Sequence, residues 1–289
     1  MLIPRYWARQ TATTPGPRGK DITVTCFGWS AVSEAEAQQQ GLERATRHAE
    51  RLAAGEALEG GYSYSSNPLR EETLKEFPSV DGTPFAVVTR NGYGCLVLNT
   101  ARVMFVDVDL PPKTASEALG RFFKSLLGKH DPYPRGKGEA SRLALVQKAL
   151  RADASLGIRV YQTASGLRYL ITSHLADPES DAAQKEMIAL AVDPAYLKLC
   201  KVQKSFRARL SPKPWRVGVP RPPHRWPFAN AGEEQAFQNW QAKYLKGCEG
   251  KAVCLLLKEY GTPVPAPEIA QVISFHDKMT GALGLLPLA

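Results

Sequence analysis

Apolar and polar positions alternate along several short stretches of the chain, a pattern typical of β-strands. Asn91-Gly92 separates two of these stretches, and an Asn-Gly pair between apolar runs is a strong hairpin signal. Ala164-Ser165-Gly166 separates another two as a tight turn. The two strands around Asn91-Gly92 and the next strand along the chain are expected to form an antiparallel meander. The predicted strands are residues 21–30, 85–90, 93–99, 103–110, 158–163, 167–173 and 205–210.

Helical periodicity fills the intervals between these strands. Ser33 to Glu36 has the form of a capping box that opens a helix, and Gly55 ends it. From Val103 onward the order is β-α-β-β-α-β, the arrangement of ferredoxin-like and RRM-like domains. The sequence therefore predicts an α+β fold with an antiparallel sheet built on this core. Further helices are predicted at 114–127, 141–154, 178–190 and 194–200, and the Thr-, Pro- and Gly-rich residues 11–20 are expected to form a loop.

The chain changes character after the segment Lys213-Pro214-Trp215-Arg216. Residues 219–227 contain four prolines together with Arg221 and Arg225, which predicts an extended basic segment. Helical patterns at 233–260 and 268–283 then indicate an appendage rather than a second core. Three parts are expected: an N-terminal strand–helix extension (1–84), an RRM-like core (85–216), and a Pro-rich linker with C-terminal helices (217–289).

The charge of the chain favours an anionic partner. The net charge is +9, and the stretch from Lys198 to Arg225 contains no acidic residue. Nucleic acid or a nucleotide is the usual partner of such a surface, and a generally basic surface is the alternative. No run is apolar enough to span a bilayer, and the N-terminus lacks the apolar core of a signal peptide, so a cytoplasmic protein without membrane contact is expected.

The sequence lacks the motifs that identify several common classes of metal site, disulfide-bonded domain and enzyme. The five cysteines include no CxxC pair, which argues against a disulfide framework or a zinc finger. The motifs of P-loop ATPases, Rossmann dehydrogenases, α/β-hydrolases and zincins are missing. His276 and Asp277 are neighbours on a predicted helix and are not expected to face each other, so a His–Asp dyad is not predicted.

Asp107 and Asp109 are the most distinctive polar pair, because they lie two residues apart on an otherwise apolar strand. Their side chains project from the same face, where two carboxylates repel each other and lose hydration. The pair therefore needs a divalent metal, an arginine, or both. Mg²⁺ or Mn²⁺ would suit phosphoryl or nucleotidyl transfer, whereas an arginine would make the pair structural.

Two residues of the neighbouring strand are candidates for the same site. In a split β-α-β sheet the strands at 103–110 and 167–173 are adjacent, so Arg168 can reach an anion beside the aspartates. His174, at the end of that strand, is a candidate metal ligand or acid–base group, with a turn residue as the alternative.

The basic region supplies candidate phosphate- and nucleic-acid-binding residues. Arg207 and Arg209 share one face of the last strand and are either partners of the aspartates or phosphate clamps, since a guanidinium binds both groups bidentately. Lys213, Trp215 and Arg216 follow, and an aromatic ring between cations suits single-stranded nucleic acid. The alternative for Trp215 is that it anchors the linker to the core.

These motifs together resemble the catalytic core of the archaeo-eukaryotic primase superfamily. The likeness rests on Asp107 and Asp109, on Ser165-Gly166-Leu167-Arg168, and on Asp193 before the Arg-rich strand, and it covers residues 85–216. It implies an RRM-like fold, metal-dependent nucleotidyl transfer and Asp193 as a third metal ligand. The family has histidine where this chain has Arg168. Segments Tyr6-Trp7-Ala8, Arg90-Asn91-Gly92-Tyr93-Gly94 and Lys213-Pro214-Trp215-Arg216 also resemble those of a group of bacterial proteins, which implies no function.

Three hypotheses follow from the sequence. The first is a bacterial, primase-like nucleotidyltransferase or related phosphoryl-transfer protein that acts on DNA, RNA or nucleotides. The second is a nucleic-acid-binding protein without catalysis, in which the aspartates pair with arginines in place of a metal. The third is a protein whose basic face binds an acidic protein partner. The C-terminal helices are a separate candidate surface for a protein partner.

Overall fold

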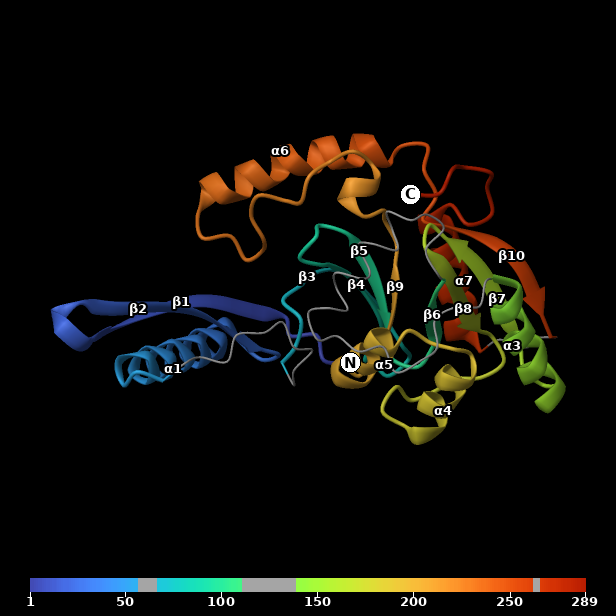
Figure 1. Cartoon of the computed structure of the whole chain (residues 1–289), viewed down its shortest axis with the longest axis horizontal. Coiled ribbons are helices and arrows are strands. Elements are labelled where there is room, and N and C mark those ends of the chain that lie inside the picture. The colour runs from blue at the N-terminus through green and yellow to red at the C-terminus, as the bar shows by residue number, and fades with distance from the viewer. Residues whose placement is uncertain (57–66, 111–138, 262–265) are drawn as a thin grey trace.

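The computed structural model describes residues 1–56, 67–110, 139–261 and 266–289, and its architecture is α+β as the sequence predicts (Figure 1). Its strands form one two-stranded and two four-stranded antiparallel sheets. We name the four-stranded sheets after a central strand of each. The β4 sheet has the order β3 (Glu72–Pro78), β4 (Pro84–Arg90), β5 (Leu96–Thr100), β9 (Phe206–Arg209). The β8 sheet has the order β10 (Cys254–Tyr260), β7 (Ile158–Thr163), β8 (Gly166–Ile171), β6 (Phe105–Asp109).

The N-terminal residues form an arm that projects from the two larger sheets (Figure 1). Strands β1 (Tyr6–Pro15) and β2 (Asp21–Ser30) pair along their whole length, and helix α1 (Glu34–Ala53) packs on them. Gly28 permits this packing, because a Cβ there would lie 1.9 Å from the carbonyl oxygen of Ala37. The Ser33 side chain caps α1 by accepting a hydrogen bond from the Glu36 backbone N–H. The predicted strand and helix of this region are therefore confirmed.

The prediction of a loop at residues 11–20 was wrong for its first half. Residues 11–15 belong to β1, and a short 3₁₀ turn, η1 (Pro17–Gly19), connects it to β2. The threonines that suggested a loop form cross-strand pairs, with 2.9 Å between the hydroxyls of Thr11 and Thr25. Threonine is β-branched and favours strands, and this preference outweighs the turn-like composition.

The predicted meander is present only as its first hairpin. Strands β4 and β5 pair antiparallel, but the turn between them covers residues 91–95, with Gly94 at a φ of +78°. β6 leaves this sheet and pairs with β8, with Asp107 opposite Arg168. The expected neighbours at 103–110 and 167–173 are thus confirmed, whereas the third strand of the meander was assigned to the wrong sheet.

The structure does not confirm a continuous split β-α-β-β-α-β sheet, because β9 pairs with β5 instead of β6. Tyr196, on helix α5 (Pro194–Gln203), explains the separation. Its buried hydroxyl lies between the two strands, 2.8 Å from the carbonyl oxygen of Arg207 on β9 and 3.1 Å from that of Phe105 on β6. A side chain thereby satisfies backbone groups that would otherwise pair across the two strands.

The C-terminal region contributes to the β8 sheet. Helix α6 (Ala231–Cys248) is followed by strand β10, where the sequence predicted a continuing helix to residue 260. β10 forms an edge of the β8 sheet by pairing with β7. The backbone N–H of Val253 donates to Thr280, the last residue of helix α7 (Pro267–Thr280), and that of Leu256 donates to Ala282 just beyond it. Residues 217–289 therefore share a sheet with the central part of the chain.

The remaining helices are α3 (Glu139–Ala152) and α4 (Asp181–Ala189), close to their predicted positions. The predicted helix at 114–127 lies outside the described residues. Within the described ranges, no helix has the length and apolar character needed to cross a membrane.

Candidate functional site

Arg168 is the positive partner of Asp107. The two residues face each other on β8 and β6, and Arg168 Nε donates to Asp107 Oδ1 at 2.8 Å. The Arg168 side chain is only 2% exposed. Its Nη1 donates to the carbonyl oxygen of Arg209 at 2.9 Å, so it also ties the β8 sheet to β9. An arginine therefore satisfies this carboxylate, as the non-catalytic hypothesis requires.

Helix α7 adds a second buried polar group to this network. His276 Nδ1 lies 3.0 Å from Asp277 Oδ1, so the dyad that helix geometry argued against does form. Arg168 Nη1 lies 3.4 Å from His276 Nε2. Because arginine can only donate, Nε2 is the acceptor and Nδ1 carries the proton that is donated to Asp277. Burial lowers the pKa of His276 to about 4.

Cys254 completes a row that resembles a Cys–His–Asp triad, with its Sγ 3.8 Å from His276 Nε2. Cys254 and His276 have no exposed surface, and Asp277 is 6% exposed. Burial also raises the pKa of the Cys254 thiol, which keeps it protonated and unreactive. Tyr161 and Arg159 donate to the same Asp277 carboxylate at 2.8 Å. This row is therefore part of the core and is closed to substrate.

Asp109 has different surroundings from Asp107. It is exposed at the end of β6, opposite Gly166 of the β7–β8 turn. Its charge acts on Lys213 and Arg216, which follow β9. Arg216 reaches the same turn, where its Nη2 donates to Ser165 Oγ at 3.2 Å. The end of the aspartate strand thus lies beside the basic segment.

Cations and exposed aromatic rings gather at this end of the strand. We call them the Lys213 cluster: Tyr93, Arg209, Lys213, Trp215, Arg216 and Arg221. The Pro214–Arg216 3₁₀ turn, η2, positions Trp215, which is 47% exposed and lies edge-on to Tyr93 with ring centroids 5.5 Å apart. Arg221 lies over both rings, at 5.1 Å from Tyr93 and 5.6 Å from Trp215. Exposure of Trp215 argues against the alternative in which it anchors the linker to the core.

Positive charges in the Lys213 cluster are crowded. Burial, followed by the charges of Arg209 and Arg216, lowers the pKa of Lys213 to about 8 against the opposing effect of Asp109. The Arg209 guanidinium has no ion pair within the described residues. A bound anion would relieve this repulsion, so the cluster has the electrostatics of an anion site.

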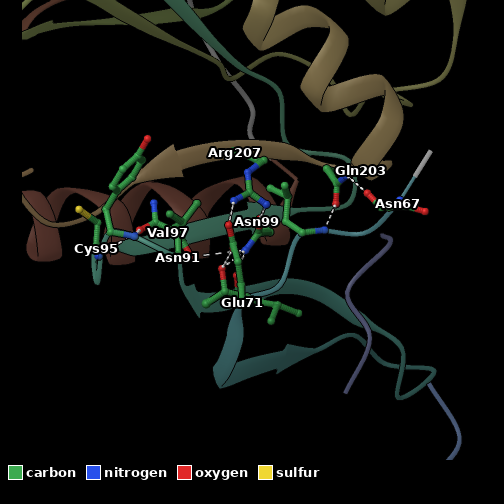
Figure 2. A network of polar contacts seen from close by, with 12 residues as sticks. Asn67, Glu71, Asn91, Cys95, Val97, Asn99, Gln203 and Arg207 are labelled. Carbon is green, nitrogen blue, oxygen red and sulfur yellow. Dashed lines mark hydrogen bonds and ion pairs between the residues drawn. The ribbon is translucent and has the colours of Figure 1, made fainter. Parts of the chain in front are cut away.

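Three other predicted site residues lie away from both the Asp107–Arg168 pair and the Lys213 cluster. Arg207 faces the interior of the β4 sheet, where it donates to Asn99 Oδ1 at 2.5 Å and to Glu71 Oε1 at 2.7 Å (Figure 2). Its guanidinium is therefore committed to a buried carboxylate instead of a phosphate. Asp193 caps α5 by accepting from the Ala195 backbone N–H, and His174 is exposed and 3.1 Å from Glu186 on α4.

The predicted metal site is not assembled by the described side chains. Asp193 contacts Asp107 through its backbone, with its N–H donating to the Asp107 carbonyl oxygen at 2.9 Å. Across residues 1–56, 67–110, 139–261 and 266–289, no three His, Cys, Asp or Glu side chains are grouped to hold a metal ion. Binding of Mg²⁺ or Mn²⁺ stays a prediction.

Sequence reasoning missed two members of the Lys213 cluster, Tyr93 and Arg221. Tyr93 belongs to the β4–β5 turn and Arg221 to the Pro-rich segment. The signal for Arg221 was the basic, acid-free stretch itself. Tyr93 had no signal beyond its exposed turn position, because its contact with Trp215 joins residues that are far apart in the chain.

Comparisons with known proteins find no match to this chain. The chain matches no protein-family model, no curated protein and no solved structure, so the primase-like likeness rests on its short motifs alone.

Proposed function

We propose that the protein binds single-stranded nucleic acid through the Lys213 cluster. The observation that carries the proposal is the crowding of Lys213 and Arg216 beside the exposed Asp109, with the Arg209 charge next to both, near two exposed aromatic rings. Cations of this density attract phosphates, and exposed rings stack on bases. Stacking favours a single strand over a duplex, whose bases are already stacked, and both DNA and RNA meet this requirement.

Asp107 has a structural role in this proposal. Its pairing with the buried Arg168 holds β6 against β8 and β9, and so positions the strand end that carries Asp109. Metal-dependent nucleotidyl transfer would require a metal to share the Asp107 carboxylate with the buried Arg168, which already donates to Oδ1. That activity, a nucleotide substrate and a protein partner for the C-terminal helices stay predictions.

The binding proposal is tested by fluorescence anisotropy with a labelled oligonucleotide as a single strand and as a duplex. The double variant Lys213→Gln/Arg216→Gln removes two phosphate-binding charges, and Trp215→Ala removes a stacking ring. Loss of stacking costs about 1–3 kcal/mol per base, so Trp215→Ala is expected to weaken single-strand binding at least about fivefold.

Lys20→Gln is the matched control. It removes one exposed positive charge in the turn between β1 and β2, where Pro15 pairs with Asp21. This arm projects away from the two larger sheets (Figure 1). The wild type and Lys20→Gln are expected to bind the single strand alike and more tightly than the duplex. Equal affinity in the wild type and in Trp215→Ala, or equal loss in Lys20→Gln and the double variant, would contradict the proposal.

A further inference from the structure

Lys213 differs from the other lysines of the described ranges in its exposure. Each of the others is exposed, whereas Lys213 is partly buried. Its Nζ has no hydrogen bond or ion pair within the described part of the chain and lies 5.5 Å from the centroid of the Trp215 ring. A lysine ammonium is strongly hydrated and is rarely withdrawn from water without a partner. Attraction of phosphate does not require this burial, because an exposed ammonium provides the same charge.

Two buried prolines, Pro212 and Pro214, fix the backbone on both sides of Lys213. Lys213 itself has an extended backbone, with φ −69° and ψ 137°. The carbonyl oxygen of Pro212 accepts from the Tyr244 hydroxyl at 2.6 Å, and that of Lys213 accepts from the Arg216 backbone N–H at 2.9 Å. Because proline also restricts the residue before it, the Lys213 side chain starts from a defined position, as a reactive group requires.

The surroundings of Lys213 favour its neutral amine. Burial is the main cause that lowers the pKa of Lys213 to about 8, followed by the charges of Arg209 and Arg216. At pH 7 about one such amine in ten is unprotonated, against fewer than about one in a thousand for an ordinary lysine. A desolvated lysine beside other cations acts as a nucleophile toward carbonyl groups. The two arginines do not compete with it, because a guanidinium stays protonated.

The neighbours of the amine restrict the kind of carbonyl compound that it meets. The charges of Arg209 and Arg216 attract phosphates, and the exposed Trp215 ring stacks on a base. A single strand of DNA carries an aldehyde between two phosphates where a deoxyribose has lost its base, since the ring-opened sugar has an aldehyde at C1′. The missing base also leaves room for the amine to reach this carbon.

We propose that Lys213 Nζ is a nucleophile that forms an imine with the aldehyde of an abasic deoxyribose in single-stranded DNA. The proposal rests on nucleic-acid binding by the Lys213 cluster and adds a covalent step to it. The amine nitrogen forms a bond to C1′, and the carbonyl oxygen leaves as water with the two protons of the neutral amine. The step needs no oxidant or reductant, and hydrolysis of the imine restores the lysine and the aldehyde.

The test traps the imine by reduction with cyanoborohydride, because hydride transfer to the C=N carbon leaves a stable secondary amine. The full chain is mixed with a labelled single strand that has one abasic deoxyribose, and the covalent complex is separated on a denaturing gel. A strand with tetrahydrofuran in place of the abasic sugar is the matched control, since it has a similar shape and no aldehyde. Lys213→Arg keeps the positive charge and lacks the nucleophile.

The yield of covalent complex at saturating strand is expected to fall at least about tenfold in Lys213→Arg, because only the partly buried amine is unprotonated to a useful extent. Lys20→Gln is expected to give the wild-type yield, and circular dichroism verifies that both variants are folded. Mass spectrometry of the wild-type complex, which needs no variant, is expected to find the sugar on Lys213. The tetrahydrofuran strand is expected to give no covalent complex.

Equal yields in the wild type and Lys213→Arg, or a sugar attached to exposed lysines instead of Lys213, would overturn the proposal. Fluorescence anisotropy with the tetrahydrofuran strand separates it from the proposed function. A wild type that binds this strand but forms no complex with the abasic strand overturns the role of the amine and leaves nucleic-acid binding intact, whereas a wild type that does not bind it overturns both. Pyridoxal 5′-phosphate is a second source of a phosphorylated aldehyde, and its attachment to Lys213 without attachment of the abasic strand would overturn the abasic strand as the substrate.

Discussion

Acidification from pH 8 to pH 5 is expected to destabilise the protein through His276. The ring has no exposed surface and is held between Arg168, Cys254 and Asp277, with Tyr161 edge-on to it. Burial is the main cause that lowers its pKa to about 4 from the ordinary 6.5, and the Arg168 charge adds to it while Asp277 opposes it. The folded protein therefore leaves the ring neutral at pH values where the unfolded chain protonates it.

The direction and size of the effect follow from this difference in proton binding. The unfolded chain binds more protons between pH 6.5 and pH 4, so stability is complete above pH 6.5 and is lost as the pH falls. Linkage between the two pKa values gives a loss of about 2 kcal/mol at pH 5 and about 3 kcal/mol once both states are protonated. A loss of 2 kcal/mol is a large part of the 5–15 kcal/mol that is typical of a folded protein.

Urea unfolding at pH 8 and pH 5 measures this loss, with His276→Gln as the variant that cannot titrate. The free energy of unfolding of the wild type is expected to fall by about 2 kcal/mol more than that of the variant. His174→Gln is the control, because Glu186 raises the pKa of His174 and its contribution has the opposite sign. An equal fall in the free energy of unfolding from pH 8 to pH 5 in the wild type and in His276→Gln would refute the reasoning. So would an NMR titration in which every histidine ring titrates above pH 6.

Other predictions concern the aspartates, one turn and the Lys213 cluster. Asp107→Asn leaves the buried Arg168 without its carboxylate and is expected to lower the free energy of unfolding by about 3–5 kcal/mol, whereas the exposed Asp109→Asn changes it by less than about 0.5 kcal/mol; urea unfolding compares them. Mn²⁺ titration should leave the thermal unfolding midpoints of the wild type and of Asp107→Asn/Asp109→Asn unchanged, and a rise found only in the wild type would support the enzyme hypothesis. Gly94→Ala is expected to lower the free energy of unfolding by about 1–3 kcal/mol, because its φ is +78° and a Cβ would lie 2.3 Å from the Trp240 ring. Gly82→Ala is the control for backbone strain alone, because Gly82 has a φ of +83° but no atom within 4 Å of a Cβ. Oligonucleotide affinity should fall about tenfold from pH 7 to pH 9 as Lys213, with a pKa of about 8, loses its proton, and the fall should be absent in Lys213→Arg.

Local sequence signals located much of the fold. The strand alternation around Asp107 and the turn at Ala164-Ser165-Gly166 placed β6, β7 and β8 correctly, and Ser33 and Gly55 marked the ends of α1. These signals work because caps, tight turns and period-two patterns depend on neighbouring residues. The choice of partner strand depends instead on residues that are far apart in the sequence. The Tyr196 hydroxyl, for example, lies between β6 and β9 and bonds to a carbonyl oxygen of each.

The same limit applies to the candidate site, whose contacts could be predicted only where they join strands that were expected to be adjacent. Arg168 was one of the arginines predicted to partner the aspartates, because the strands at 103–110 and 167–173 were expected to be adjacent, and the structure places it opposite Asp107. Arg207 and Arg209 share a strand face, yet Glu71 draws Arg207 into the β4 sheet. Glu71 lies 136 positions away in the sequence, and no local pattern connects the two. The His276–Asp277 contact likewise depends on Arg168 and Tyr161 from the β8 sheet, which bring α7 onto it.

The most direct measurement of the central claim is the salt dependence of oligonucleotide binding. Each phosphate that is neutralised on a single strand contributes about 0.7 to the slope of log Kd against log salt concentration. If Lys213 and Arg216 each contact a phosphate, the slope for Lys213→Gln/Arg216→Gln should be smaller than that of the wild type by about 1.4, while Lys20→Gln keeps the wild-type slope. An unchanged slope in the double variant would contradict nucleic-acid binding at the Lys213 cluster.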